Sequence, residues 1–85
     1  MRVKSIKPFA ATAVQWTGLN YQEISALLEY APIEKKNGDL LLPTEMCDDF
    51  PMELRKTEWL VIYDWLDRID TFTDEGFWLF FEEDV

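Results

Sequence analysis

The hydrophobic pattern of the chain centres on a run of five apolar residues, Trp59–Tyr63. All five are aromatic or branched, which are residue types that suit a tightly packed, pleated surface. A strand with one face in water would alternate polar and apolar residues. This run does not alternate, so we expect both of its faces to be covered. It therefore predicts the central strand of a small sheet. A helix is the alternative, because Trp59, Ile62, Leu66 and Ile69 also recur at helical spacing.

A first strand is predicted over Phe9–Thr17, after an extended opening at Lys7-Pro8. The two-residue period of a strand places Val14 and Trp16 on one face and Gln15 on the other. We expect Trp16 to belong to the core, because a tryptophan on a strand is usually well buried.

A helix is predicted from about Tyr21 to Tyr30. Asn20 is expected to be its N-cap, and Glu23 completes a pattern similar to a capping box. The apolar residues at helical spacing are Tyr21, Ile24, Leu27, Leu28 and Ala31. Pro32 prevents the helix from continuing. A helix this short is not stable alone, so it must pack on the sheet.

A hairpin is predicted over Ile33–Leu42, because Asn37-Gly38 can supply the positive φ values of a type I′ turn between two apolar segments. The segment Pro43–Pro51 begins and ends with a proline, so we expect it to be irregular. Met52–Leu54 is expected to form a short strand before the central one.

The chain after the central strand is expected to add two more strands. Asp64–Asp67 is interpreted as a connection, Arg68–Phe72 as a strand, and Thr73–Gly76 as a turn or one short helical turn. Phe77–Phe81 is interpreted as a closing strand. The whole pattern predicts a single domain over residues 1–85 with an α+β fold. In this fold one short helix packs on a small, mostly antiparallel sheet of about five strands.

Charge is distributed unevenly along the 85 residues, whose net charge is −9. Residues 1–44 hold five bases and four acids, a net of +1, whereas residues 45–85 hold three bases and thirteen acids, a net of −10. Such a field repels nucleic acid and favours encounter with basic protein surfaces. Acidic residues can also serve only to keep an aromatic-rich domain soluble.

The residue inventory excludes most catalytic arrangements. The chain has no histidine and one cysteine, Cys47, so it lacks an imidazole base and an internal disulfide. Negative charge at Asp48 and Asp49 disfavours a reactive thiolate. We therefore expect no enzyme activity, no catalytic residue, no metal site and no cofactor. A carboxylate site at Asp64, Asp67, Asp70 and Asp74 is the alternative, although acids spaced through turns usually face solvent.

No apolar run approaches the roughly 18 residues that span a bilayer, and no hydrophobic leader follows the basic N-terminus. We therefore expect no membrane contact and a cytoplasmic location.

Aromatic residues among the downstream acids are the candidate partner-binding residues. Trp65 lies between Asp64 and Asp67 in the expected connection, where a large ring either packs back into the core or contacts a partner. The run Phe77–Phe81 cannot point inward throughout if it is a strand, which suggests a binding face or a homodimer interface, with simple closure of the sheet as an equal alternative. The predicted partner-binding residues are Asp64, Trp65, Asp67, Asp70, Asp74, Glu75 and Trp78.

Several motifs give the chain a family resemblance. Lys7-Pro8, Ala13–Gly18, Asn20 and Glu23-Ile24 resemble the opening of a group of small bacteriophage and prophage proteins. Their later tryptophan strand is similar to Glu58–Val61, and their ending is similar to Phe77 with Phe81-Glu82. The resemblance implies a phage origin and an α+β fold, and it carries no activity.

These observations predict a small, acidic, phage-encoded binding protein in the bacterial host cytoplasm. It would inhibit or modulate a host protein that has a basic surface, in the manner of a DNA mimic, without binding nucleic acid directly. Two alternatives stay open. One is a binder that sequesters a small nucleotide signal, and the other is a minor structural or accessory oligomeric phage protein.

Overall fold

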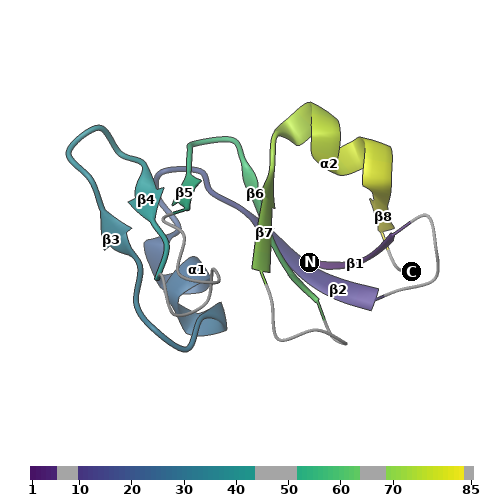
Figure 1. Cartoon of the computed structure of the whole chain (residues 1–85), viewed down its shortest axis with the longest axis horizontal. Coiled ribbons are helices and arrows are strands. Elements are labelled where there is room, and N and C mark those ends of the chain that lie inside the picture. Colours follow the sequence, from purple (N-terminus) through teal and green to yellow (C-terminus); the bar gives the residue numbers. More distant parts are fainter. Residues whose placement is uncertain (6–9, 44–51, 64–68, 84–85) are drawn as a thin grey trace.

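The structure is a computed structural model, and it describes residues 1–5, 10–43, 52–63 and 69–83. Its fold is α+β, with two short helices and two antiparallel sheets (Figure 1). The prediction of a single helix is therefore wrong. Along the chain the elements are β1 (Arg2–Ser5), β2 (Ala10–Gln15), α1 (Tyr21–Leu27), β3 (Ile33–Glu34), β4 (Leu40–Leu41), β5 (Glu53–Leu54), β6 (Trp59–Tyr63), β7 (Ile69–Phe72), α2 (Asp74–Phe80) and β8 (Phe81–Glu83).

The larger sheet has five strands in the order β7-β6-β2-β1-β8, and every neighbouring pair is antiparallel. The strand predicted at Trp59–Tyr63 is confirmed as β6, and the helical alternative is wrong. The middle position nevertheless belongs to β2, because β1 and β8 extend the sheet on its far side. The pattern did not predict β1, since Arg2–Ser5 contains one apolar residue, Val3.

Both faces of β6 are covered, as its apolar run predicts. Leu60 belongs to a hydrophobic cluster on one face of the sheet, whereas Trp59 and Val61 belong to a cluster on the other face. The side chains of β2 divide between the two clusters in the same way. Val14, and Trp16 just after the strand, belong to the cluster of Leu60, whereas Ala11 and Ala13 belong to the cluster of Trp59. Trp16 is fully buried, which confirms its predicted place in the core.

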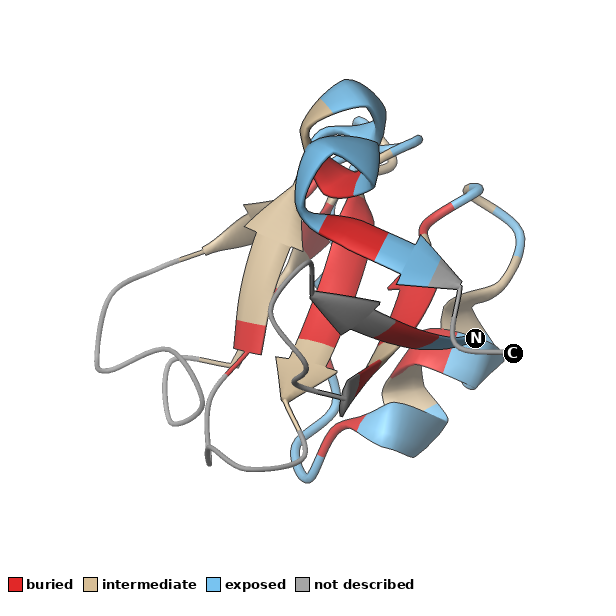
Figure 2. Cartoon of the chain, turned by 90° about the vertical axis from the view of Figure 1, so that its right-hand side faces the viewer, coloured by how far each residue is buried: buried red, intermediate tan, exposed pale blue. Residues whose placement is uncertain are grey.

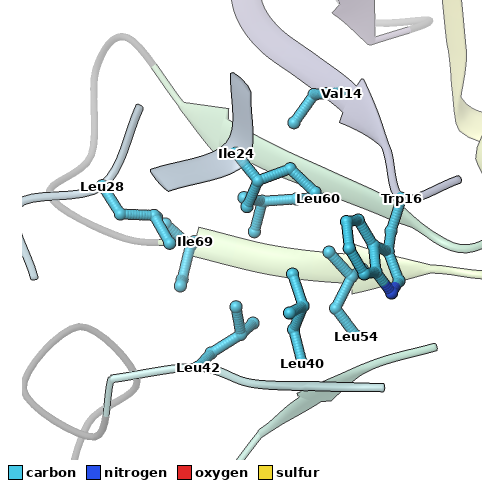
Figure 3. Packing of buried hydrophobic residues seen from close by; sticks show 9 residues of the cluster. All are labelled: Val14, Trp16, Ile24, Leu28, Leu40, Leu42, Leu54, Leu60 and Ile69. Atoms are coloured by element: carbon cyan, nitrogen blue, oxygen red, sulfur yellow. The ribbon is translucent and has the colours of Figure 1, made fainter. Parts of the chain in front are cut away.

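The first cluster lies between the larger sheet, α1 and the smaller sheet. Figure 3 shows Ile24 of α1 against Leu60, with leucines of the smaller sheet opposite. Its buried members are Val14, Trp16, Ile24, Leu28, Leu40, Leu42, Leu54, Leu60 and Ile69. The second cluster lies under α2 and consists of Val3, Ala11, Ala13, Trp59, Val61, Phe77 and Phe81.

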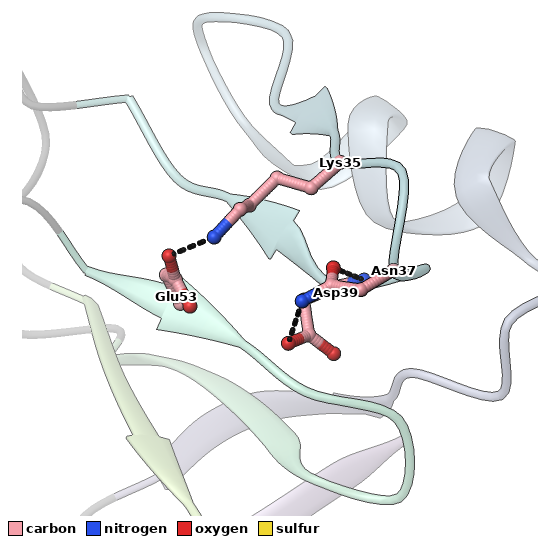
Figure 4. A network of polar contacts seen from close by, with 4 residues as sticks. All are labelled: Lys35, Asn37, Asp39 and Glu53. Atoms are coloured by element: carbon pink, nitrogen blue, oxygen red, sulfur yellow. Dashed lines mark hydrogen bonds and ion pairs between the residues drawn. The ribbon is translucent and has the colours of Figure 1, made fainter.

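The smaller sheet contains the predicted hairpin, β3-β4, and the predicted short strand, β5. The turn is not type I′, because Gly38 alone has a positive φ (90°) and Asn37 does not. Gly38 N–H donates to the carbonyl of Lys35, and Lys35 N–H donates to the carbonyl of Asp39. This is the three-residue loop in which a glycine follows an ordinary turn. Figure 4 shows the Asn37–Asp39 contacts and the Lys35–Glu53 ion pair of 2.6 Å across the sheet.

Helix α1 begins at the predicted residue but ends at Leu27 instead of Tyr30. Leu28 is already extended (φ −105°, ψ 144°), and its N–H donates to the Ser25 carbonyl in the last turn. The predicted capping box is also wrong. The Asn20 amide donates to the Gln15 carbonyl and to Glu23, and its oxygen accepts from Thr17, so the side chain closes the loop before the helix.

The largest correction concerns Phe77–Phe81, which was predicted to be a strand. Asp74–Phe80 forms helix α2, and β8 starts only at Phe81. Thr73 caps the helix, because its Oγ1 accepts a hydrogen bond of 3.1 Å from Gly76 N–H. Two acidic residues in the first turn also favour a helix start. These signals outweigh the β-propensity of the aromatic residues.

Candidate functional site

Helix α2 exposes three consecutive large apolar side chains. Trp78 is 48% exposed, Leu79 is 68% exposed and Phe80 is 56% exposed, whereas Phe77 is fully buried. We call Trp78, Leu79 and Phe80 the α2 face. In Figure 2 most of α2 carries the colour of exposed residues and lies over the buried sheet. An exposed apolar cluster of this kind is typical of an interaction surface.

The α2 face is backed by an aromatic cluster. Trp59 of β6 stacks on Phe77 with ring centroids 4.2 Å apart and planes 7° apart. Trp78 meets Trp59 edge-on at 5.6 Å and Phe77 edge-on at 4.8 Å. Phe80 lies 6.1 Å from Phe72 of β7. Because the exposed rings rest on buried ones, their orientation is largely set before any partner binds, which lowers the entropy cost of binding.

Asp74 anchors the start of α2 to the sheet. Its Oδ1 accepts a hydrogen bond of 2.8 Å from Trp59 Nε1 and a longer one of 3.4 Å from Gln15 Nε2. Gln15 Nε2 also donates to the Thr57 carbonyl at 2.9 Å. Asp74 was predicted to bind a partner. The structure gives this carboxylate an internal role in positioning α2, although the residue is exposed.

The other predicted partner-binding residues lie in three situations. Glu75 and Trp78 are exposed on α2, next to Asp74. Asp70 is half-buried on β7 and accepts a hydrogen bond from the Tyr63 hydroxyl. It pairs with Val61 in register, so it lies on the sheet face that α2 covers. The predicted residues Asp64, Trp65 and Asp67 lie outside the described residues.

Two members of the α2 face, Leu79 and Phe80, were missing from the predicted binding residues. Both belong to the run Phe77–Phe81, in which an unburied side was expected. In a helix, residues four apart lie on the same side, so a helical reading of this run places Phe77 and Phe81 together on the buried side. It leaves the three residues between them on the exposed side.

The charged residues of α2 itself are all acids. The charged residues of α2 are Asp74 and Glu75, and those of β8 are Glu82 and Glu83. No base lies within either element. Glu82 alternates with buried Phe81 and is in register with Lys4 of β1, so only the start of the helix adds acids to the exposed apolar side chains of α2. This is the opposite of the charge required for contact with phosphate groups.

The segment Gln15–Gly18 of the family-like motif has a structural role at the junction of the two sheets. Trp16 Nε1 donates to the Gly38 carbonyl at 2.8 Å, and Trp16 exchanges backbone hydrogen bonds with Thr57 and Glu58. Thr57 has a φ of 77°, which is unusual for a β-branched residue. Gly18 lies under the aliphatic chain of the neighbouring Lys56. These contacts join the smaller sheet to the larger one.

Within the part of the chain that the structure describes, no group of three His, Cys, Asp or Glu residues is placed to hold a metal ion. Neither helix is long and apolar enough to cross a bilayer.

In comparisons with known proteins, no family model matches the chain, and no curated protein or solved structure is significantly similar to it.

Proposed function

We infer that the protein is a non-enzymatic binding protein whose α2 face docks onto another protein. The observation that carries this proposal is the exposure of Trp78, Leu79 and Phe80 in one helix beside Asp74 and Glu75. Tryptophan is among the residue types enriched in the few positions that carry most of the binding energy of an interface. Acids beside them add selectivity for a basic surface and speed the encounter.

The sign of the charge favours a foreign partner over a second copy. Two copies that met through the same face would place only acids of α2, Asp74 and Glu75, at the contact, and the helix contains no base to complement them. Like charges brought together disfavour such a contact. Since the sequence resembles small bacteriophage proteins, the partner in this proposal is a basic protein of the bacterial host, met in the host cytoplasm and inhibited or modulated there.

Affinity capture from a bacterial lysate tests this function. The wild-type protein is immobilised beside Leu79→Ser and beside Leu19→Ser, a matched control at a side chain that is 96% exposed. We expect wild type and Leu19→Ser to retain the same basic protein at about 0.1 M salt. Leu79→Ser should lose it, and washing at about 1 M salt should release it. Equal retention on all three columns, or indifference to salt, contradicts the proposal.

DNA mimicry is a narrower form of the same function. If the acids of the protein occupy a nucleic-acid site on the partner, duplex DNA should displace the captured protein in a concentration-dependent way. If the partner stays bound at saturating DNA, the proposal of DNA mimicry is wrong, whereas docking at the α2 face is not contradicted.

A further inference from the structure

We propose that the α2 face binds an arginine side chain of the partner, with the guanidinium group stacked on the outer face of the Trp78 ring and hydrogen-bonded to Glu75. This inference rests on the proposed function and specifies the chemical group by which the partner is recognised. Three observations carry it: how the Trp78 ring is held, where Glu75 lies beside it, and the state of the Glu75 carboxylate.

The Trp78 ring lies beside an aromatic stack and not on top of it. Phe77 and Trp59 are stacked with ring centroids 4.2 Å apart, and Trp78 is nearly perpendicular to both rings, at 4.8 Å from Phe77 and 5.6 Å from Trp59. A ring on top of the stack would be much farther from one member than from the other. Perpendicular rings at such short distances meet edge to face. The edges of Phe77 and Trp59 therefore point at one face of Trp78.

The opposite face of the Trp78 ring is left to solvent, since 48% of the side chain is exposed. The face of an indole ring carries the negative part of its quadrupole, so it attracts cations. Because its inner face rests against two other rings, the outer face is held in place before any ligand binds. The ring therefore offers a preformed surface to a flat cation.

Glu75 lies next to this ring on the surface of α2. Residues three and four apart are neighbours on a helix, and their side chains lean toward its N-terminus. Trp78 and Leu79, three and four residues after Glu75, therefore extend over the turn that carries its carboxylate. Glu75 is exposed and, within the part of the chain that the structure describes, has no ion pair or hydrogen bond. Asp74 already accepts a hydrogen bond from Trp59, so Glu75 is the carboxylate that is available to a partner.

Arginine is the residue that matches these three side chains together. Its guanidinium group is planar, stacks on aromatic faces and donates hydrogen bonds to a carboxylate, whereas the ammonium group of lysine is compact and strongly hydrated. The aliphatic stem of an arginine can pack on Leu79 at the same time. An uncharged group of the same shape would lose both the attraction to the ring and the ion pair with Glu75.

The probes are three blocked peptides of the sequence Gly-Leu-X-Leu-Gly that differ only in the central residue X. This residue is arginine, lysine or citrulline, which has the shape of arginine without its charge. Each peptide is titrated into the whole, isotope-labelled protein, and the nuclear magnetic resonance signal of the Leu79 backbone amide gives the dissociation constant. This method is suitable because a single contact of this kind binds weakly.

We expect the arginine peptide to bind wild type about three-fold or more tighter than the lysine peptide, and the citrulline peptide to bind more weakly still. Trp78→Leu keeps an apolar side chain but removes the ring face, so it should reduce the preference for arginine over lysine to less than about 1.5-fold. Glu75→Gln should weaken the binding of both cationic peptides.

Two matched controls lie outside α2. Tyr30→Leu removes a ring that is 47% exposed, and Glu29→Gln removes an exposed carboxylate. Both should change the dissociation constants by less than about 1.5-fold. Far-ultraviolet circular dichroism verifies that each variant is folded.

Equal binding of the arginine and lysine peptides overturns the inference, as does failure of the arginine peptide to bind. A preference for arginine that survives Trp78→Leu, or that is lost equally in Tyr30→Leu, also overturns it. A shift of the α2 signals when the protein alone is concentrated would identify an arginine of a second copy, such as exposed Arg55, as the occupant and would overturn the foreign source.

The lysate capture separates this inference from the proposed function. If a lysate protein depends on Leu79 while the preference for arginine is absent, the proposed function stands and the arginine site is wrong. If neither result is obtained, both are wrong.

Discussion

The indole of Trp59 donates a hydrogen bond of 2.8 Å to the carboxylate of Asp74, and this bond ties the first residue of α2 to strand β6. The two residues are 15 positions apart in the sequence. Trp59 also stacks on Phe77, so one side chain holds both the start and the middle of the helix. The orientation of the α2 face therefore depends on a contact that involves none of its three members.

Removing this contact should destabilise the protein. Asp74→Ala leaves the mostly buried indole N–H of Trp59 without its acceptor, and we expect a loss of about 1–3 kcal/mol in the free energy of unfolding. Asp74→Asn keeps an oxygen acceptor and should lose less. Urea denaturation followed by tryptophan fluorescence measures both. Equal free energies of unfolding for Asp74→Ala and wild type would show that the bond does not stabilise the fold.

The two sides of α2 should respond very differently to truncation. Phe77 is fully buried between Trp59 and Phe81, so Phe77→Ala should cost about 3–5 kcal/mol. Leu79 is largely exposed, so Leu79→Ser should change stability by no more than about 0.5 kcal/mol. Thermal unfolding of both variants checks this contrast, and a large loss in Leu79→Ser would mean that the α2 face is part of the core.

Substitution of Thr57 should stabilise the protein. Its φ of 77° is strained for a β-branched residue, and the bonds it makes use its backbone N–H and carbonyl, which any residue retains. We expect Thr57→Gly to gain about 0.5–1 kcal/mol, the relief of strain exceeding the greater freedom of the unfolded chain. Thr57→Asn, which tolerates this conformation, serves as a second variant. A loss of stability in both would contradict the prediction.

Gly38→Ala should be destabilising by about 1 kcal/mol, because φ is 90° at this residue. A Cβ would also approach Lys56 Cε to 2.6 Å and Nζ to 2.8 Å. The end of a lysine chain can move, so we attribute the cost to the backbone. The substitution should then cost the same in a Lys56→Ala background, within about 0.5 kcal/mol. A much smaller cost in that background would assign the effect to the contact.

Stability should depend on pH through Glu53. The hydrogen bond from Lys35, and then its positive charge, lower the pKa of Glu53 below the usual 4.5. A carboxylate whose folded-state pKa is depressed contributes stability above its unfolded-state pKa and loses this contribution as pH falls through the folded-state pKa. Wild type should therefore exceed Glu53→Gln in urea midpoint at neutral pH. The difference should shrink below pH 4.5 and vanish once the pH lies below the lowered folded-state pKa. A difference independent of pH would exclude the ion pair as its cause.

The sequence predicted those parts of the fold in which one local signal dominates. The run Trp59–Tyr63 is apolar at every position, and as strand β6 it is covered on both faces. The hairpin followed from Asn37-Gly38, although the loop length, and with it the turn type, depends on how β3 and β4 pair. By contrast, α2 contains competing signals, since its aromatic residues favour a strand while the Thr73 cap favours a helix.

The candidate site was only partly predictable for a related reason. Trp78 was identified because it belongs to the run Phe77–Phe81, which cannot point inward throughout. The positioning role of Asp74 could not be inferred, because its partners Trp59 and Gln15 approach it only through the sheet order. Leu79 and Phe80 were missed because a strand, with its period of two, divides Phe77–Phe81 differently from a helix.

The pairing of β1 with β8 brings Val3 opposite Glu83 and joins the first and last strands of the sheet. During synthesis on the ribosome, β1 can pair with β2 early, but its other neighbour, β8, is absent until that strand has emerged. Phe77 and Phe81, which belong to the same buried cluster as Trp59 and Val61, are made with α2 and with the first residue of β8. Trp59 and Val61 are therefore made before the side chains that cover them, and this side of the sheet stays open to aggregation on the nascent chain until Phe77 and Phe81 have emerged.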